Sequence, residues 1–237
     1  IFGSAINTIN LTGAGSGLEI TSSTDSQRNN FGKIQNINVE DGATFYNRVT
    51  SYNGWVLNPE NNINISLAGA GNGSATGAAL SLGYSCGSGG TVAFGDKVNF
   101  SLSDDATVIV HGRNNANNAD IAGVINTTIQ GNGHTLTKIG TGKLTLENGA
   151  SKTSLNVNEG ELVLKGAATT SERVELGEAA TITGKQDGLA TMSKVQMSST
   201  GITGTAQDGS SSISDADIEV LAQDATFTIE EVQTKPS

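Results

Sequence analysis

Residues 136–146 read Leu-Thr-Lys-Ile-Gly-Thr-Gly-Lys-Leu-Thr-Leu, and residues 155–164 read Leu-Asn-Val-Asn-Glu-Gly-Glu-Leu-Val-Leu. In both stretches apolar side chains largely alternate with polar ones, which places one face of an extended strand inward and the other outward. Glycine separates the two short strands of each stretch and supplies the backbone angles that a tight corner needs. The pattern predicts short strands joined by tight corners.

Similar alternating segments recur along the rest of the chain. They include residues 34–39, 62–67, 98–102, 107–110, 174–176 and 226–229. Charged residues make up 15% and aromatic residues 4% of the 237 residues, while glycine contributes 31 of them. An ordinary soluble domain has about 25% charged residues and about 7% glycine. The composition therefore argues against a large helical fold and favours many short strands joined by turns.

A short motif, an acidic or glycine-rich step followed by Ala-Thr and a strand, occurs four times. Its alanines are Ala43, Ala106, Ala180 and Ala225, so successive copies are 63, 74 and 45 residues apart. These spacings match three, three and two turns of roughly 21–25 residues, a period typical of solenoids. A β-sandwich has no reason to repeat one corner motif at multiples of one length. We therefore expect a solenoid rather than a sandwich.

The segment 129–166 strongly resembles the strand repeat of bacterial autotransporter passenger domains. In that repeat a Gly-Thr-Gly-x-Leu-x-Leu segment, here residues 140–146, is followed by a Val-x-x-Gly-x-Leu-x-Leu segment, here residues 157–164. Members of the family are exported right-handed parallel β-helices, many of them adhesins and some with enzymatic insertions. The resemblance implies an all-β, right-handed parallel β-helix (solenoid), and the solenoid period corresponds to roughly ten coils.

The same resemblance gives expectations for domain organisation and location. We expect residues 1–237 to form a single β-solenoid domain with irregular N-terminal coils, in which residues 1–60 are a candidate cap region. The expected location is the bacterial cell surface or the extracellular medium. We expect any signal peptide and any translocator to lie outside these residues.

Charge and cysteine content narrow the classes of partner. The formal net charge is −10, and the segment from Asp208 to Glu231 contains seven acidic residues and no basic one, so nucleic-acid binding is disfavoured. Cys86 is the only cysteine, and the two histidines occur in unrelated sequence contexts, so we expect no disulfide within the chain, no metal site and no cofactor. No run of about 18 apolar residues is present, so we expect no membrane-spanning helix.

Two pairs of carboxylates are the candidates for catalysis. They are Asp104 with Asp105, and Asp215 with Asp217. Two nearby carboxyl groups can share a proton and act as acid and base, which would suit a hydrolase that acts on mucin-like glycoproteins at acid pH. On a strand, Asp215 and Asp217 would point to the same side, whereas Asp104 and Asp105 would point to opposite sides unless a turn reorients them. Solvated acidic residues in turns are the simpler interpretation.

A group of aromatic residues is the candidate for binding. Phe45, Tyr46, Tyr52 and Trp55 fall within eleven residues, with asparagine and arginine side chains between them. Aromatic faces beside amide groups suit sugar rings, although the same residues could instead cap the end of the solenoid. No sequence motif assembles a convincing active site. The preferred function is therefore a non-catalytic surface adhesin or scaffold that binds host glycans or mucin-like glycoproteins.

This interpretation predicts that Trp55 contributes to glycan binding. Because aromatic anchors carry a large share of binding energy, Trp55→Ala should weaken the binding of mucin-type glycans by at least ~1 kcal/mol. Trp55 is the only tryptophan, so its fluorescence should shift or be quenched during the titration. If the variant unfolds and the wild-type emission does not respond to glycans, the aromatic group is a structural cap.

Overall fold

The computed structural model describes residues 6–22, 31, 33–49, 55–69, 78–84, 90–111, 121–158 and 160–164, together with five later strands, 174–176, 181–185, 195–200, 218–223 and 226–231. Over these residues the chain forms 21 strands and no helix, and every strand pairing is parallel. The expected all-β class is confirmed. None of the described residues belongs to a helix that is long and apolar enough to cross a membrane.

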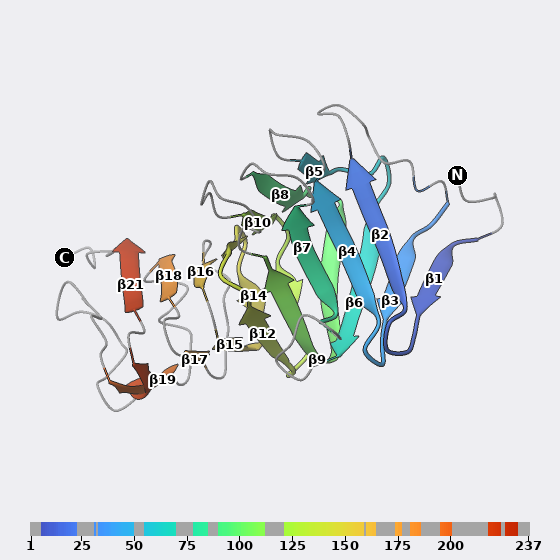
Figure 1. Cartoon of the computed structure of the whole chain (residues 1–237). Helices are drawn as coiled ribbons and strands as arrows, with labels where there is room; N and C mark the ends of the chain where they lie inside the picture. The colour runs from blue at the N-terminus through green and yellow to red at the C-terminus, as the bar shows by residue number, and fades with distance from the viewer. Residues whose placement is uncertain are drawn as a thin grey trace, which may run out of the picture.

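The strands lie in three rows, each built from pairings between successive passes of the chain (Figure 1). The first row contains β1 (Thr8–Leu11), β3 (Asn36–Val39), β6 (Ile63–Gly69), the first half of β9 (Val98–Val110), β11 (Ile129–Gln130) and β14 (Ala150–Ser151). The second row contains β2 (Gly17–Ser22), β4 (Thr44–Val49), β7 (Leu80–Tyr84), the second half of β9, β12 (Thr135–Ile139), β15 (Ser154–Val157), β17 (Val174–Leu176), β19 (Val195–Thr200) and β20 (Ile218–Gln223). Because β9 belongs to both rows, they form one 14-stranded sheet.

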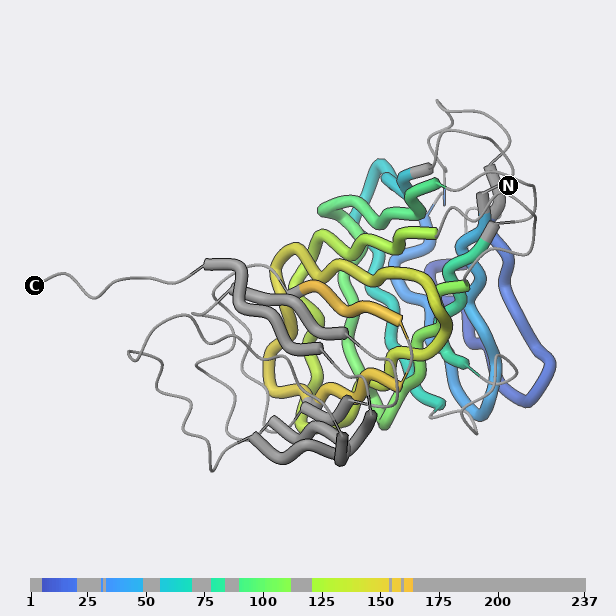
Figure 2. Tube along the Cα trace, turned by 60° about the vertical axis from the view of Figure 1, so that its left-hand side comes forward, coloured from blue at the N-terminus to red at the C-terminus, as the bar shows by residue number. Residues whose placement is uncertain are grey.

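The third row is a separate seven-stranded sheet. It contains β5 (Trp55–Leu57), β8 (Thr91–Phe94), β10 (Ala122–Ile125), β13 (Lys143–Leu146), β16 (Glu161–Leu164), β18 (Thr181–Lys185) and β21 (Thr226–Glu231). The tube view shows successive passes of the chain stacked beside one another (Figure 2). The described strands thus form a stack that grows in one direction along the sequence.

The length of chain between paired strands is not constant, which corrects the expected period. Phe45 pairs with Leu80 and Leu80 with Val108, so the first two Ala-Thr motifs lie two pairing steps apart rather than three. Thr181 pairs directly with Thr226, so the last two motifs are neighbours in their sheet rather than two steps apart. The reason is variable corner length: the segment between β9 and β10 is much longer than the segment between β12 and β13.

The core consists of inward side chains that stack from strand to strand. Ile37 pairs with Ile65 and Ile65 with Phe100, and all three side chains are buried. Phe94, from the third row, packs edge-on against Phe100 with ring centroids 4.8 Å apart and lies 6.4 Å from the ring of Phe45. Alternation along each strand therefore places apolar residues between the rows, where stacking joins them into one continuous core.

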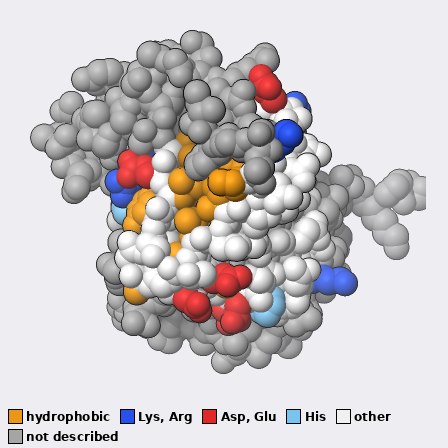
Figure 3. Space-filling view, turned by 90° about the vertical axis from the view of Figure 1, so that its right-hand side faces the viewer, with side chains coloured by type: hydrophobic (Ala, Val, Ile, Leu, Met, Phe, Trp, Pro, Cys, Tyr) orange, Lys and Arg blue, Asp and Glu red, His pale blue; other side chains and the backbone are white. Residues whose placement is uncertain are grey.

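The N-terminal end of this core is less completely covered by the described residues. Ile9, Leu11, Leu18 and Ile20 pack against the core but are only partly buried. Seen from this end, hydrophobic side chains form a patch on the surface of the described part (Figure 3). These residues belong to the first strands of two rows, β1 and β2, each of which pairs with a strand on one side only.

A glycine corner connects the second row to the third within residues 129–166. Gly140 has a φ of 80°, and a side chain there would collide with the carbonyl oxygen of Val110. Lys138 is 1% exposed, and its ammonium donates hydrogen bonds to the carbonyl oxygens of Ile139 and Gly140. A Cβ at Gly160 would lie 2.6 Å from the carbonyl oxygen of Gly140, so glycine is needed there too. The corner carbonyls therefore replace water around a lysine that points inward.

Asn47 breaks the apolar pattern of the core. Its side chain is fully buried on β4 and pairs in register with Ile20 and Leu82. Neither Oδ1 nor Nδ2 has a hydrogen-bond partner in the part of the chain that the structure describes. An unpaired buried amide carries a desolvation cost, so we expect Asn47 to destabilise the fold at this position.

We expect Asn47→Leu to raise the free energy of unfolding by about 1–3 kcal/mol, because it removes the unpaired polar atoms and continues an apolar row. Urea unfolding monitored by circular dichroism measures this change. The matched control is Leu82→Asn, the reverse change on the neighbouring strand, which should lower the stability. A loss of stability in Asn47→Leu would show that the amide makes a hydrogen bond that stabilises the core.

Candidate functional site

A local irregularity in β9 positions the first carboxylate pair. Leu102 pairs with Leu67 and Ala106 with Gly69, so β9 contains extra residues between these positions and its register shifts. The side chains of residues 103–105 are exposed at this bulge. The bulge is the turn that brings the adjacent side chains of Asp104 and Asp105 to one side of the strand.

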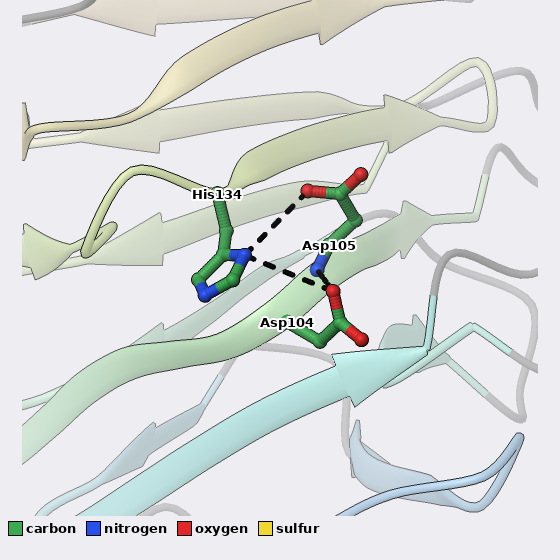
Figure 4. Close-up of side chains that lie close together, drawn as sticks. All are labelled: Asp104, Asp105 and His134. Atoms are coloured by element: carbon green, nitrogen blue, oxygen red, sulfur yellow. Dashed lines mark hydrogen bonds and ion pairs between the residues drawn. The ribbon is translucent and has the colours of Figure 1, made fainter.

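His134 approaches this pair from the next pass of the chain (Figure 4). Its Nδ1 atom lies 3.7 Å from Asp104 Oδ1 and 3.9 Å from Asp105 Oδ1. The backbone N–H of His134 donates to the carbonyl oxygen of Gly131 at 2.9 Å, which fixes the turn before β12. The imidazole therefore faces both carboxylates, and it forms an ion pair with them only when it is protonated.

Hydrogen bonds between strands hold the cluster of Asp104, Asp105 and His134 in place. The backbone N–H of Thr135 donates to Asp105 Oδ1 at 2.7 Å, and the N–H of Asp105 donates to Asp104 Oδ1 at 2.8 Å. Asn132 Nδ2 donates to the carbonyl oxygen of Leu102 at 2.9 Å. The turn that carries His134 is thereby tied to the bulge that carries the two carboxylates.

This arrangement supports two kinds of chemistry. One ligand atom from each residue lies within 4.8 Å of the others, and carboxylate oxygens with an imidazole nitrogen can hold a divalent cation. Two neighbouring carboxyl groups are also the kind of pair that a hydrolase uses as acid and base. The side chains of Asp104 and Asp105 are 77% and 54% exposed, however, whereas electrostatic catalysis is strongest in a site that excludes water.

Sequence reasoning found the two aspartates but missed His134. The histidines were expected to lie in unrelated contexts, yet His134 lies beside the pair because Leu136 pairs with Ala106. Only the register of β12 on β9 brings these residues together, and no local motif encodes that register. The other predicted pair, Asp215 and Asp217, lies outside the described residues.

The predicted aromatic patch is only partly described. Phe45 is completely buried and packs toward Phe94, so its expected place in an exposed patch is wrong. The alternation of β4 explains this, because Phe45 points inward and Tyr46 outward. The half-buried Tyr46 ring lies under the Arg48 guanidinium, 4.5 Å from its centroid. Tyr52 and the side chain of Trp55 lie outside the described part of the structure.

A second polar cluster lies on the outer side of the second row. Ser81 Oγ and His111 Nε2 are 2.9 Å apart, and Arg48 forms an ion pair of 3.3 Å with Glu19. Burial, and secondly the positive charge of Arg48, lower the pKa of His111 below its ordinary value of 6.5. The Ser81 side chain is only 1% exposed, so this serine–histidine pair offers no accessible nucleophile.

The lowered pKa of His111 predicts a pH-dependent stability. In the pH range between the folded-state pKa and 6.5, the unfolded chain binds a proton that folded His111 does not, so stability falls as pH decreases through this range. We expect His111→Gln to remove that loss between about pH 7.5 and 5, measured by urea unfolding at several pH values. His134→Gln is the matched control. An unchanged pH profile in His111→Gln would contradict this assignment.

Comparison of the chain with protein-family models, with curated proteins and with solved structures finds no match. The resemblance to autotransporter passenger domains therefore rests on residues 129–166 of the sequence.

Proposed function

We propose that this chain is an exported, right-handed parallel β-helix of roughly ten coils, with irregular N-terminal coils, that serves as a non-catalytic adhesin or scaffold. Its partners are host glycans or mucin-like glycoproteins, and it acts at the bacterial cell surface or in the extracellular medium. The observation that carries this proposal is the parallel stack that runs from β1 to β21. Such a stack builds an extended, rigid surface for binding.

The handedness follows from a general property of parallel strands. A connection between two parallel strands of one sheet is right-handed in about 98% of cases, because the strand twist favours that path. Each row here consists of parallel strands connected through the other rows. The proposed helix is therefore right-handed.

The register of the autotransporter-like segment supports the proposed family. Leu136 pairs with Leu155, and Leu144 pairs with Leu162, so the two halves of the repeat lie directly on one another. This is the arrangement that a repeated coil produces, since equivalent residues of successive repeats stack in one row. It supports a passenger-type β-helix.

Tyr46 is the one residue of the proposed aromatic patch whose side chain the structure both describes and leaves partly exposed. Its ring lies on the outer side of β4 beside Arg48, whose ion pair with Glu19 holds the guanidinium over it. The guanidinium covers one face of this ring, so only the rest of the ring can contact a sugar. The proposed patch therefore consists of Tyr46, Tyr52 and Trp55, without Phe45.

A carboxylate-dependent hydrolase is the second candidate. The observation that favours it is the cluster of Asp104, Asp105 and His134, because three titratable groups from two passes of the chain converge there. In this role, one carboxyl group donates a proton and the other acts as base on a water molecule. The second pair, Asp215 and Asp217, belongs to the same hypothesis.

Binding and cleavage of mucin-type glycoproteins distinguish the two candidates. We expect the wild-type chain to bind immobilised mucin and to release no fragments at pH 4–7, because the described carboxylates lie in open solvent rather than in an enclosed site. Asp→Asn changes at Asp104, Asp105, Asp215 and Asp217 should leave binding within about twofold. Glycan arrays and mass spectrometry of the supernatant provide the measurements.

If the wild-type chain releases fragments and these substitutions abolish the release, the chain is a hydrolase and the proposal of a non-catalytic adhesin is wrong. Absence of binding to every glycan and glycoprotein on the array would contradict the adhesin itself. Retention of full cleavage in all four variants would exclude these carboxylates as the catalytic groups.

A further inference from the structure

The strands of the first row carry no charged side chain. Its described strands, β1, β3, β6, Val98–Leu102 of β9, β11 and β14, contain no Asp, Glu, Lys or Arg. The other two rows do carry charged side chains at the surface, among them Glu19 and Arg48 in the second row and Lys143 and Glu161 in the third. In a chain of net charge −10, an uncharged exposed sheet is a distinct surface.

Asparagine side chains form ladders on this face. Asn99 Nδ2 donates to Asn64 Oδ1 at 3.3 Å, and Asn64 Nδ2 donates to Asn36 Oδ1 at 3.3 Å. In the neighbouring column, Asn38 Nδ2 donates to Asn10 Oδ1 at 2.8 Å. The pairings of β1, β3, β6 and β9 stack these residues in register. The ladders therefore fix the amide groups at the regular spacing of the strands.

The ladder leaves hydrogen-bonding capacity that faces solvent. A side-chain amide has two N–H donors and two acceptor lone pairs, and in the ladder Asn64 uses one donor and one lone pair. Asn10, Asn64 and Asn99 are exposed. Donors and acceptors thus recur about every 4.8 Å along each column, and the two columns lie about 7 Å apart.

We infer that this face binds an uncharged polysaccharide, whose neighbouring hydroxyl groups bond to the ordered amides. The inference rests on the proposed glycan-binding function, names a ligand class for it and adds a second contact surface to the aromatic patch of Tyr46, Tyr52 and Trp55. Charge selects the ligand: the strands of this face carry no cation for an acidic glycan, Lys97 at their edge donates a hydrogen bond to the carbonyl oxygen of Glu60, and the acidic chain repels polyanions. Ordered amides also bind hydroxyl groups without first losing side-chain freedom.

Affinity electrophoresis with the full chain tests this inference. Native gels contain hydroxyethyl cellulose or dextran as the neutral probes, or alginate as the anionic probe. The wild-type chain should be retarded by at least one neutral polymer and not by alginate. Asn64→Asp should reduce the affinity about tenfold, because it places a carboxylate in the ladder and removes an amide donor.

Two further variants make the result specific to this face. Asn158→Asp makes the same change of charge at an exposed corner and should keep wild-type affinity. Ser66→Asp changes the other column without removing a ladder amide, so it tests the face if Asn64→Asp unfolds. Its affinity for the neutral polymer should also fall about tenfold. Circular dichroism of each variant monitors folding.

Three results would overturn the inference. The first is affinity within twofold of wild type in both Asn64→Asp and Ser66→Asp. The second is a wild-type chain that binds mucin on the array but binds neither neutral polymer, a result that leaves the proposed function intact. Failure to bind any glycan would contradict both the proposed function and this inference. The third is a concentration-dependent dimer that Asn64→Asp abolishes, which would identify the face as a contact between two copies of the chain.

Discussion

In-register parallel pairing between distant segments is the constraint on which the rest of this structure depends. The paired residues Lys143 and Glu161 are 18 residues apart in sequence, whereas Thr8 and Asn36 are 28 residues apart. In both cases the two residues are in-register partners on adjacent parallel strands. A slip of one residue would turn every inward side chain of a strand to the outside. The apolar alternation therefore selects the register, and the variable corners absorb the differences in length.

The same register orders the outer surface. Because inward residues stack, outward residues stack as well, and polar side chains far apart in sequence become neighbours. The amide ladder through Asn36, Asn64 and Asn99 arises in this way. So does the approach of His134 to Asp104 and Asp105 across adjacent strands. Both surfaces are consequences of core packing, and each places chemical groups at fixed spacing without an enclosed active site.

Local alternation predicted the strands well, and residues 136–146 and 155–164 form them as expected. It could not predict the pairing step, because the segments that connect successive strands differ in length. The burial of Phe45 was predictable in principle, since Phe45 and Tyr46 are adjacent on one strand and must point to opposite sides. The aromatic group was defined by closeness in sequence, which does not separate the two sides. The burial of Asn47 could not be predicted from the sequence, because the alternation that identifies a strand places apolar side chains, and not an amide, on the inward side.

Inter-strand nuclear Overhauser effects in isotopically labelled protein test the central claim most directly. Parallel stacking predicts backbone contacts between Leu136 and Leu155 and between Leu144 and Leu162, whose strands lie about 4.8 Å apart. An antiparallel hairpin would instead place residues 135–139 against residues 143–146 across the Gly140 corner. Cross-peaks for the first set would support the stack, and cross-peaks for the hairpin would contradict it.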